Sequence, residues 1–192
     1  MKQKAIQAAR KLLFEARQNE PLITKDLQII ADSVKAEMVG LENKFKSEKS
    51  LQRKLSEKFQ ARNIPIDKIA KRNNDTLRYT FVFEKEKYGA GVSEALSLIK
   101  TAGYEISRIW NAWSLENSDA DAGYRGINVT VISSQNQKFE LQFHTKASFR
   151  HKTETHQLYE EFRTLKTSDE RKIEIAGTIL EAAKKVKRPP GI

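Results

Sequence analysis

The sequence contains no cysteine and only three histidines among its 192 residues. Without cysteine there are no disulfide bonds, no thiolate metal sites and no cysteine nucleophile. With only three histidines and no cysteine, we do not expect a zinc site. No stretch approaches the roughly 20 apolar residues that cross a bilayer. Residues 1–20 carry charges throughout, where a signal peptide needs an apolar run. We therefore expect no membrane association and a cytoplasmic site of action.

Positive charge is what the sequence has in excess. Lysine and arginine number 35 against 25 aspartates and glutamates, which gives a formal net charge of +10. An excess of this size favours polyanionic partners such as nucleotides, RNA or an acidic protein. The length fits about one domain. The apolar residues, 39% of the total, recur with regular periods, so we expect a folded core.

The most informative stretch runs from residue 123 to 145 and has the pattern of a β-hairpin. Apolar residues alternate along both arms around a polar turn at residues 133–136. Successive side chains of a strand point to opposite faces, so the polar residues of the arms share the second face. That face is either a wet outer surface or the floor of an active site. The candidate residues on or beside it are Tyr124, Arg125, Asn128, Glu140, Gln142 and His144.

A second candidate site is the basic segment of residues 43–54, a loop that runs into a helix. Its cations are Lys44, Lys46, Lys49, Arg53 and Lys54. Near a helix N-terminus the free backbone N–H groups also attract anions. We expect this segment to bind phosphate groups, with a solvated charged helix face as the plainer interpretation.

Apolar periodicity also predicts the remaining elements. We expect two helices over residues 2–18 and 24–41, broken near Pro21 and folded as an N-terminal helical hairpin. After the basic segment, the predicted order is strand, helix, strand, hairpin and two helices, at residues 76–84, 89–103, 104–113, 123–145, 146–166 and 167–186. This order indicates an α+β fold in which helices back a mixed sheet of four or five strands. We divide the chain into a helical extension at 1–42, a core at 43–166 and a C-terminal helix at 167–192.

Asp75 precedes the first predicted strand, and strand alternation assigns its side chain to the apolar face. Its alternation parity matches the apolar Leu77 rather than the polar Arg78. Asp75 therefore reaches the polar side only if the chain turns or bulges there.

Four segments, in this order, resemble the synthetase domain of the RelA/SpoT-homologue family, the alarmone synthetases. The family's basic ATP loop, Arg-x-Lys-x-x-x-Ser, is similar to residues 44–50 (KFKSEKS), with lysine in the arginine position. Its metal-binding strand, Asp-x-x-Gly-x-Arg, is similar to residues 75–80 (DTLRYT), where glycine and arginine are both replaced. The segments Tyr-Arg-(Gly/Ser)-Ile-His and Glu-(Leu/Ile)-Gln-Ile-Arg-Thr are similar to residues 124–128 (YRGIN) and 140–145 (ELQFHT). The resemblance covers roughly residues 40–165.

The resemblance implies a synthetase-like nucleotidyltransferase fold and an ATP-dependent pyrophosphokinase. Such an enzyme transfers the β,γ-pyrophosphate of ATP to a ribose 3′-hydroxyl of an adenosine or guanosine nucleotide, which makes (p)ppApp- or (p)ppGpp-type products and releases AMP. By the same resemblance, Asp75 and Glu140 hold Mg²⁺ and serve catalysis. The residues implied for ATP are Lys44, Lys46, Ser50, Lys54 and Arg78, the last from a shifted position. The residues implied for the acceptor are Tyr124, Arg125, Asn128, Gln142 and His144.

Two departures from the family pattern suggest a toxin-type member. The loop before the acceptor tyrosine is typically basic in the family, whereas here it carries Glu116, Asp119 and Asp121. Three carboxylates repel a 5′-polyphosphate, so an adenosine nucleotide or the 3′ end of tRNA is the expected acceptor. No histidine precedes an aspartate, as it does in the family's hydrolases. A synthetase without a hydrolase implies growth inhibition, with an antitoxin or immunity protein as partner or delivery as an effector domain.

Two other interpretations remain open from the sequence. A non-catalytic RNA-binding module could use residues 44–54 and the basic residues 184–188, although closely spaced aromatic residues for single-strand binding are lacking. A partner-binding protein could dock through its N-terminal helices. Neutralising Asp75 and Glu140 separates these from a Mg²⁺-dependent transferase, because only the transferase loses its activity.

Overall fold

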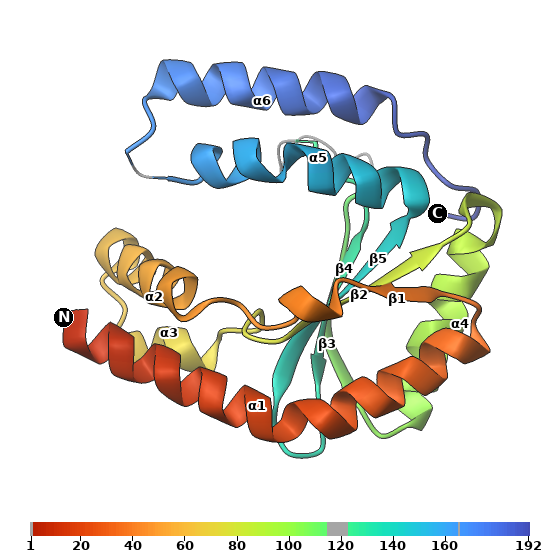
Figure 1. Cartoon of the computed structure of the whole chain (residues 1–192), viewed down its shortest axis with the longest axis horizontal. Helices are drawn as coiled ribbons and strands as arrows, with labels where there is room; N and C mark the ends of the chain where they lie inside the picture. The colour runs from red at the N-terminus through yellow and green to blue at the C-terminus, as the bar shows by residue number, and fades with distance from the viewer. Residues whose placement is uncertain (1, 115–122, 165) are drawn as a thin grey trace.

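The computed structural model describes residues 2–114, 123–164 and 166–192, which form a five-stranded sheet with helices on both faces (Figure 1). The strand order across the sheet is β1-β2-β5-β4-β3. The strands are β1 (Glu37–Val39), β2 (Arg78–Phe83), β3 (Glu105–Asn111), β4 (Ile127–Ile132) and β5 (Lys138–Thr145). Because β2 and β5 run parallel while the other neighbours run antiparallel, the sheet is mixed, as predicted.

Six α-helices surround the sheet in the described part of the chain. They are α1 (Lys2–Ser33), α2 (Glu48–Arg62), α3 (Ile66–Lys71), α4 (Tyr88–Thr101), α5 (Lys146–Phe162) and α6 (Asp169–Lys184). Short 3₁₀ turns, η1 (Leu41–Asn43) and η2 (Lys85–Lys87), precede the basic loop and α4. Helices α1 and α4 lie against one face, and α5 with α6 lies over the other (Figure 1). None of the described helices is long and apolar enough to cross a membrane.

The predicted N-terminal helical hairpin is wrong, because α1 is a single 32-residue helix that contains Pro21. Proline removes one intrahelical hydrogen bond and usually ends or kinks a helix. Here Ala16 before the proline and Ile23 after it are both buried in the main core, and this packing outweighs the local penalty. The region expected to continue the second helix is instead β1, where Met38 pairs with Phe81.

The predicted β-hairpin is confirmed as β4 and β5, with the reverse turn where it was expected. Burial alternates strictly along β4, and every second residue of β5 from Phe139 to Phe143 is fully buried. Aromatic side chains from β2 complete this core: the Phe81 and Phe143 rings meet edge to face with centroids 5.7 Å apart. The apolar face of the hairpin therefore points into the protein, which leaves the other face for polar chemistry.

A second, smaller apolar cluster fastens α2 to the body of the protein. It joins the first half of α1 to α2 and α3 through Leu13, Leu51, Leu55, Ile66 and Ile69. The fully buried residues of α2 are Leu51 and Leu55, while its Lys54 turns toward Asp75. The N-cap Ser47 begins α2 by accepting a hydrogen bond from the Ser50 N–H.

Candidate active site

Two polar rows cross the sheet on the face opposite the main core. Strand register sets them, because β5 pairs with β2 on one side and with β4 on the other. The first row consists of Arg78, Glu140, Thr130 and Arg108. The second consists of Thr80, Gln142, Asn128 and Trp110. The polar face predicted from the hairpin thus extends over four strands.

A hollow of about 290 Å³ opens on this face and brings the two predicted metal-binding carboxylates together. Asp75 and Glu140 both line it, with Lys54 from α2. Arg108 and Trp110 also line the hollow, and neither was predicted as a site residue. Strict alternation along residues 104–113 would have placed both on the core face with Tyr104 and Ile106. The register of β3 shifts between Ile106 and Arg108, and this irregularity turns Arg108 and Trp110 to the polar face.

Asp75 sits between two lysines of the basic segment. Its Oδ2 accepts from Lys46 Nζ at 2.7 Å and its Oδ1 from Lys54 Nζ at 2.6 Å. Burial acts to raise the pKa of the Asp75 carboxyl, but Lys54 and Lys46 outweigh it and hold the pKa well below its usual range. Burial lowers the pKa of Lys54, against the attraction of Asp75. The chain bends at Thr76, so strand parity does not apply to Asp75, and it reaches the polar side.

The other residues predicted for ATP are more dispersed. Ser50 lies at the N-terminus of α2, where its hydroxyl accepts from Ser47 Oγ at 2.9 Å. Lys44 does not join the Asp75 cluster, because its ammonium pairs with Glu20 of α1 at 2.7 Å. Lys44 can therefore reach a ligand on the polar face only by giving up this ion pair.

Arg78 lies at the start of β2, directly opposite Glu140 in the register. Its Nη2 donates to the Asn43 carbonyl at 3.2 Å. Its Nε is buried and has no hydrogen-bond partner among the described residues. A buried donor without a partner is costly, so Arg78 is suited to an anionic ligand that would supply the missing acceptor.

Three of the five predicted acceptor residues form a hydrogen-bonded group: Tyr124, Asn128 and His144. The Tyr124 hydroxyl donates to Asn128 Oδ1 at 2.9 Å and lies 2.9 Å from His144 Nε2. A tyrosine hydroxyl has one proton, so His144 Nε2 is the donor in that contact. The Tyr124 ring stacks on Trp110, with centroids 5.5 Å apart and planes at 26°. The group therefore holds an aromatic platform beside the hollow.

His144 is fully buried beneath this platform. The side chain of Arg125 turns to the backbone of Tyr124 and not to the hollow. Burial lowers the pKa of His144 well below its usual range, and the nearby Lys152 lowers it further. His144 is therefore a neutral hydrogen-bonding residue at neutral pH. The Arg125 guanidinium donates to the Tyr124 carbonyl at 2.9 Å, a contact that stabilises the turn before β4.

Gln142 uses both ends of its amide inside the protein. Its Nε2 donates to Glu140 Oε1, and its Oε1 accepts from Lys152 Nζ of α5. Nothing in the sequence pattern pointed to Lys152, because only the return of α5 over the sheet brings it to Gln142. The acceptor contact predicted for Gln142 requires it to release one of these partners.

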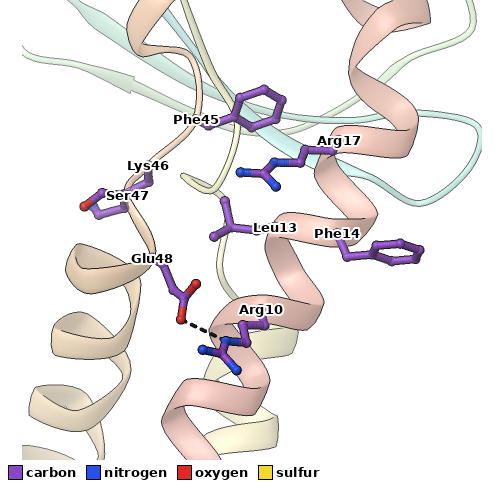
Figure 2. Close-up of a pocket in the computed structure, with 8 residues that line it drawn as sticks. All are labelled: Arg10, Leu13, Phe14, Arg17, Phe45, Lys46, Ser47 and Glu48. Carbon is purple, nitrogen blue, oxygen red and sulfur yellow. Dashed lines mark hydrogen bonds and ion pairs between the residues drawn. The ribbon is translucent and has the colours of Figure 1, made fainter.

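A larger hollow of about 550 Å³ lies between α1 and residues 45–48, and Figure 2 shows its lining. The Arg17 guanidinium lies 5.9 Å from the centroid of the Phe45 ring, a cation–π distance. The carboxylate of Glu48 in this hollow is paired with Arg10 at 3.0 Å. The larger hollow has one carboxylate in its lining, whereas the smaller hollow has two, Asp75 and Glu140. We therefore take the smaller hollow as the candidate active site. The predicted acidic loop, with Glu116, Asp119 and Asp121, lies outside the described residues.

Solved structures of alarmone synthetases share this architecture, although no family model and no curated protein matches the sequence. Small alarmone synthetase 1 from Bacillus subtilis, bound to its product pppGpp, superposes with a TM-score of 0.63 at 15% identity, over 92% of this chain and 91% of that chain. The type VI effector Tas1, in complex with its immunity protein, gives 0.56 at 16% identity, over 94% and 98%. A GTP pyrophosphokinase family protein from Streptococcus pneumoniae gives 0.52 at 18% identity, over 94% and 84%.

The mixed sheet and its covering helices define the chain as an α+β domain. More particularly, it has the fold of the small alarmone synthetases, which confirms the RelA/SpoT-type synthetase fold predicted from the four segments. At these identities the likeness establishes the fold.

Proposed function

We propose that this protein is an ATP-dependent pyrophosphokinase that transfers the β,γ-pyrophosphate of ATP to the ribose 3′-hydroxyl of a purine nucleotide. One observation carries the proposal: Asp75 and Glu140 face a single hollow next to Lys54. The fold shared with alarmone synthetases supports the same reaction class. Phosphoryl-type transfer needs cations on the phosphates and an acceptor held in line, and both requirements have candidates here.

In the proposed reaction the acceptor 3′-oxygen attacks the β-phosphorus of ATP. A bond forms between this oxygen and the β-phosphorus, and the bond from the β-phosphorus to the oxygen bridging the α-phosphate breaks. AMP leaves with the electron pair, and Glu140 takes the proton of the hydroxyl. Lys46, Lys54 and Arg78 neutralise the phosphate charge, the first two by exchanging Asp75 for phosphate oxygens.

The residues present fit Mg²⁺ bound together with substrate. No cluster of three or more histidine, aspartate or glutamate side chains that could hold a metal ion occurs within residues 2–114, 123–164 and 166–192. Mg²⁺ in such enzymes is typically held by one or two carboxylates, with substrate phosphates and water completing the shell. Asp75 and Glu140 are the residues that would hold it. When bound, the ion would neutralise charge on the transferred pyrophosphate.

The aromatic pair of Tyr124 and Trp110 supports a nucleotide acceptor, because a purine stacks well on such rings. We also propose that the activity inhibits growth and is neutralised by a partner protein, since the fold is shared with an effector solved together with its immunity protein. Transfer onto the 3′ end of tRNA is the alternative acceptor that the same chemistry allows.

The test uses Mg²⁺ and ATP labelled at the β-phosphate, with GDP, GTP, AMP, ADP, ATP and bulk tRNA as acceptors. We expect the wild type to label one class of acceptor and to release AMP. The Glu140→Gln variant should lose transfer by several orders of magnitude, because it keeps the shape of the side chain without its charge. Absence of labelled product from all acceptors, with tight RNA binding that Glu140→Gln does not weaken, would instead establish an RNA-binding module.

A further inference from the structure

Lys152 of α5 connects to Glu140 through the amide of Gln142. Helix α5 begins directly after β5 and passes back over the polar face of the sheet (Figure 1). Thr145 caps it through a reciprocal capping box with Ser148, which fixes the direction in which the helix leaves the strand. As a result the Lys152 ammonium reaches Gln142, ten residues earlier in the chain.

Hydrogen-bonding chemistry dictates which way the Gln142 amide points. An ammonium group only donates and an ionised carboxylate only accepts. The Gln142 oxygen must therefore face Lys152 and its NH₂ must face Glu140, as the structure shows. A flipped amide would place NH₂ against the ammonium and the amide oxygen against the carboxylate. The charge of Lys152 thus determines the amide orientation that presents a donor to Glu140.

We propose that Lys152 is a positioning residue for the pyrophosphoryl transfer: by orienting Gln142, it holds one oxygen of Glu140 and leaves the other oxygen free for the reaction. The inference rests on the proposed function for its catalytic consequence. The hydrogen-bonded arrangement itself does not depend on it.

The surroundings of Lys152 support this assignment. Its ammonium lies 5.6 Å from the centroid of the Phe149 ring, a cation–π contact from the preceding turn of α5. Burial lowers the pKa of Lys152 to about 8, while Glu140 acts to raise it and Arg78 to lower it. The Lys152 ammonium is thus partly desolvated and interacts electrostatically with Glu140. In this it differs from the solvated lysines of a helix surface.

The kinetic test compares Lys152→Met, Lys152→Arg, Gln142→Met and the Lys152→Met/Gln142→Met double variant. We expect Lys152→Met to lower kcat about 10- to 100-fold, the usual effect of losing a partner one shell away from the reacting groups. The KM for ATP should change less than about threefold, since Lys152 does not bind the substrate, and Lys152→Arg should recover part of kcat. The double variant should be no slower than Gln142→Met alone, because Lys152 acts only through Gln142.

Lys146→Met is the matched control, because Lys146 lies on the same helix, is exposed and pairs with Glu84 away from the hollow. It should keep wild-type kcat. Additive losses in the double variant, or a fully active Lys152→Met, would overturn the proposal.

A second readout needs no substrate and separates this inference from the proposed function. The side-chain amide signals of Gln142, identified by their absence in Gln142→Met, should shift in the NMR spectrum of Lys152→Met and stay in place in Lys146→Met. If the wild type transfers no pyrophosphate yet the amide signals shift as expected, the proposed function fails while the arrangement stands. Unmoved amide signals in Lys152→Met refute the arrangement, whatever the activity.

Discussion

Individual residues of the polar face have roles that their environment assigns. His144 has the same imidazole as any histidine, but complete burial keeps it neutral, and its ring nitrogens then hold Tyr124 and Ser148. The environment also restricts residue 126 to glycine, because a Cβ at this position would lie 2.8 Å from the His144 ring. The glycine in the Tyr-Arg-Gly-Ile segment is thus explained by the close approach of His144.

The lowered pKa of His144 predicts a pH dependence of stability. In the unfolded chain a histidine binds a proton below about pH 6.5, whereas buried His144 stays neutral until a much lower pH. Below about pH 6.5 the unfolded state therefore binds more protons than the folded state. The contribution of His144 to the free energy of unfolding is fully present above about pH 6.5 and is lost as the pH falls below it. Urea unfolding should show wild type losing up to about 2 kcal/mol more than His144→Gln between pH 7.5 and 5.0.

His151 serves as an internal reference in that comparison, because burial lowers its pKa as well and both proteins retain it. Equal losses in wild type and His144→Gln would show that His144 is protonated without cost in the folded state. That result would contradict its burial beneath the Tyr124 platform.

At the scale of elements, local signals predicted most strands and helices correctly and failed where packing overrode them. The hairpin, α4, β3 and the last two helices follow from alternation and helical periodicity. The break at Pro21 and the continuation of a helix through Met38 do not occur. In both places contacts with the core outweighed the local signal.

Pro21 predicts a gain of stability on substitution. Its side chain is exposed, so Pro21→Ala loses little buried surface and restores a backbone donor inside α1. Proline costs about 3 kcal/mol in a helix interior relative to alanine, offset by up to about 1 kcal/mol from its restriction of the unfolded chain. We expect urea unfolding to show a gain of about 1 to 2 kcal/mol for Pro21→Ala.

The control for this substitution is Gln18→Ala, at another exposed position of α1, which should stay within about 0.5 kcal/mol of wild type. A loss of stability in Pro21→Ala would mean that α1 needs the curvature that proline imposes in order to pack along both apolar clusters.

At the scale of the whole molecule, Asp75 of the candidate active site joins parts of the chain that are distant in sequence. Lys46 lies 29 residues and Lys54 21 residues from Asp75, and both reach it. The side chains of all three are mostly buried, with exposed fractions of 9%, 14% and 13% for Lys46, Lys54 and Asp75. Two of the cationic side chains thus meet at one internal position, and in the proposed reaction phosphate oxygens replace the carboxylate there.

Asp75→Asn should therefore destabilise the protein as well as abolish transfer. It leaves two neighbouring buried ammonium groups without a counter-charge, and removing one partner of a buried ion pair costs about 3 to 5 kcal/mol. Urea unfolding in low-phosphate buffer measures the loss, and added pyrophosphate should restore stability more in Asp75→Asn than in wild type. A loss below about 1 kcal/mol would show that solvent screens the cluster as it does surface ion pairs.

The sequence alone determined what depends on neighbours along the chain. Alternation in residues 123–145 assigned Glu140, Gln142 and His144 to one polar face, and the order of four segments indicated the synthetase fold. The assignment to one face is local, because strand faces follow from the two-residue repeat of the backbone. The synthetase fold was indicated by the resemblance of the four segments. Tertiary structure decided the rest: the pairing of β2 with β5 places Arg78 beside Glu140, and the return of α5 brings Lys152 to Gln142. Such contacts depend on packing between distant segments, which no local pattern encodes.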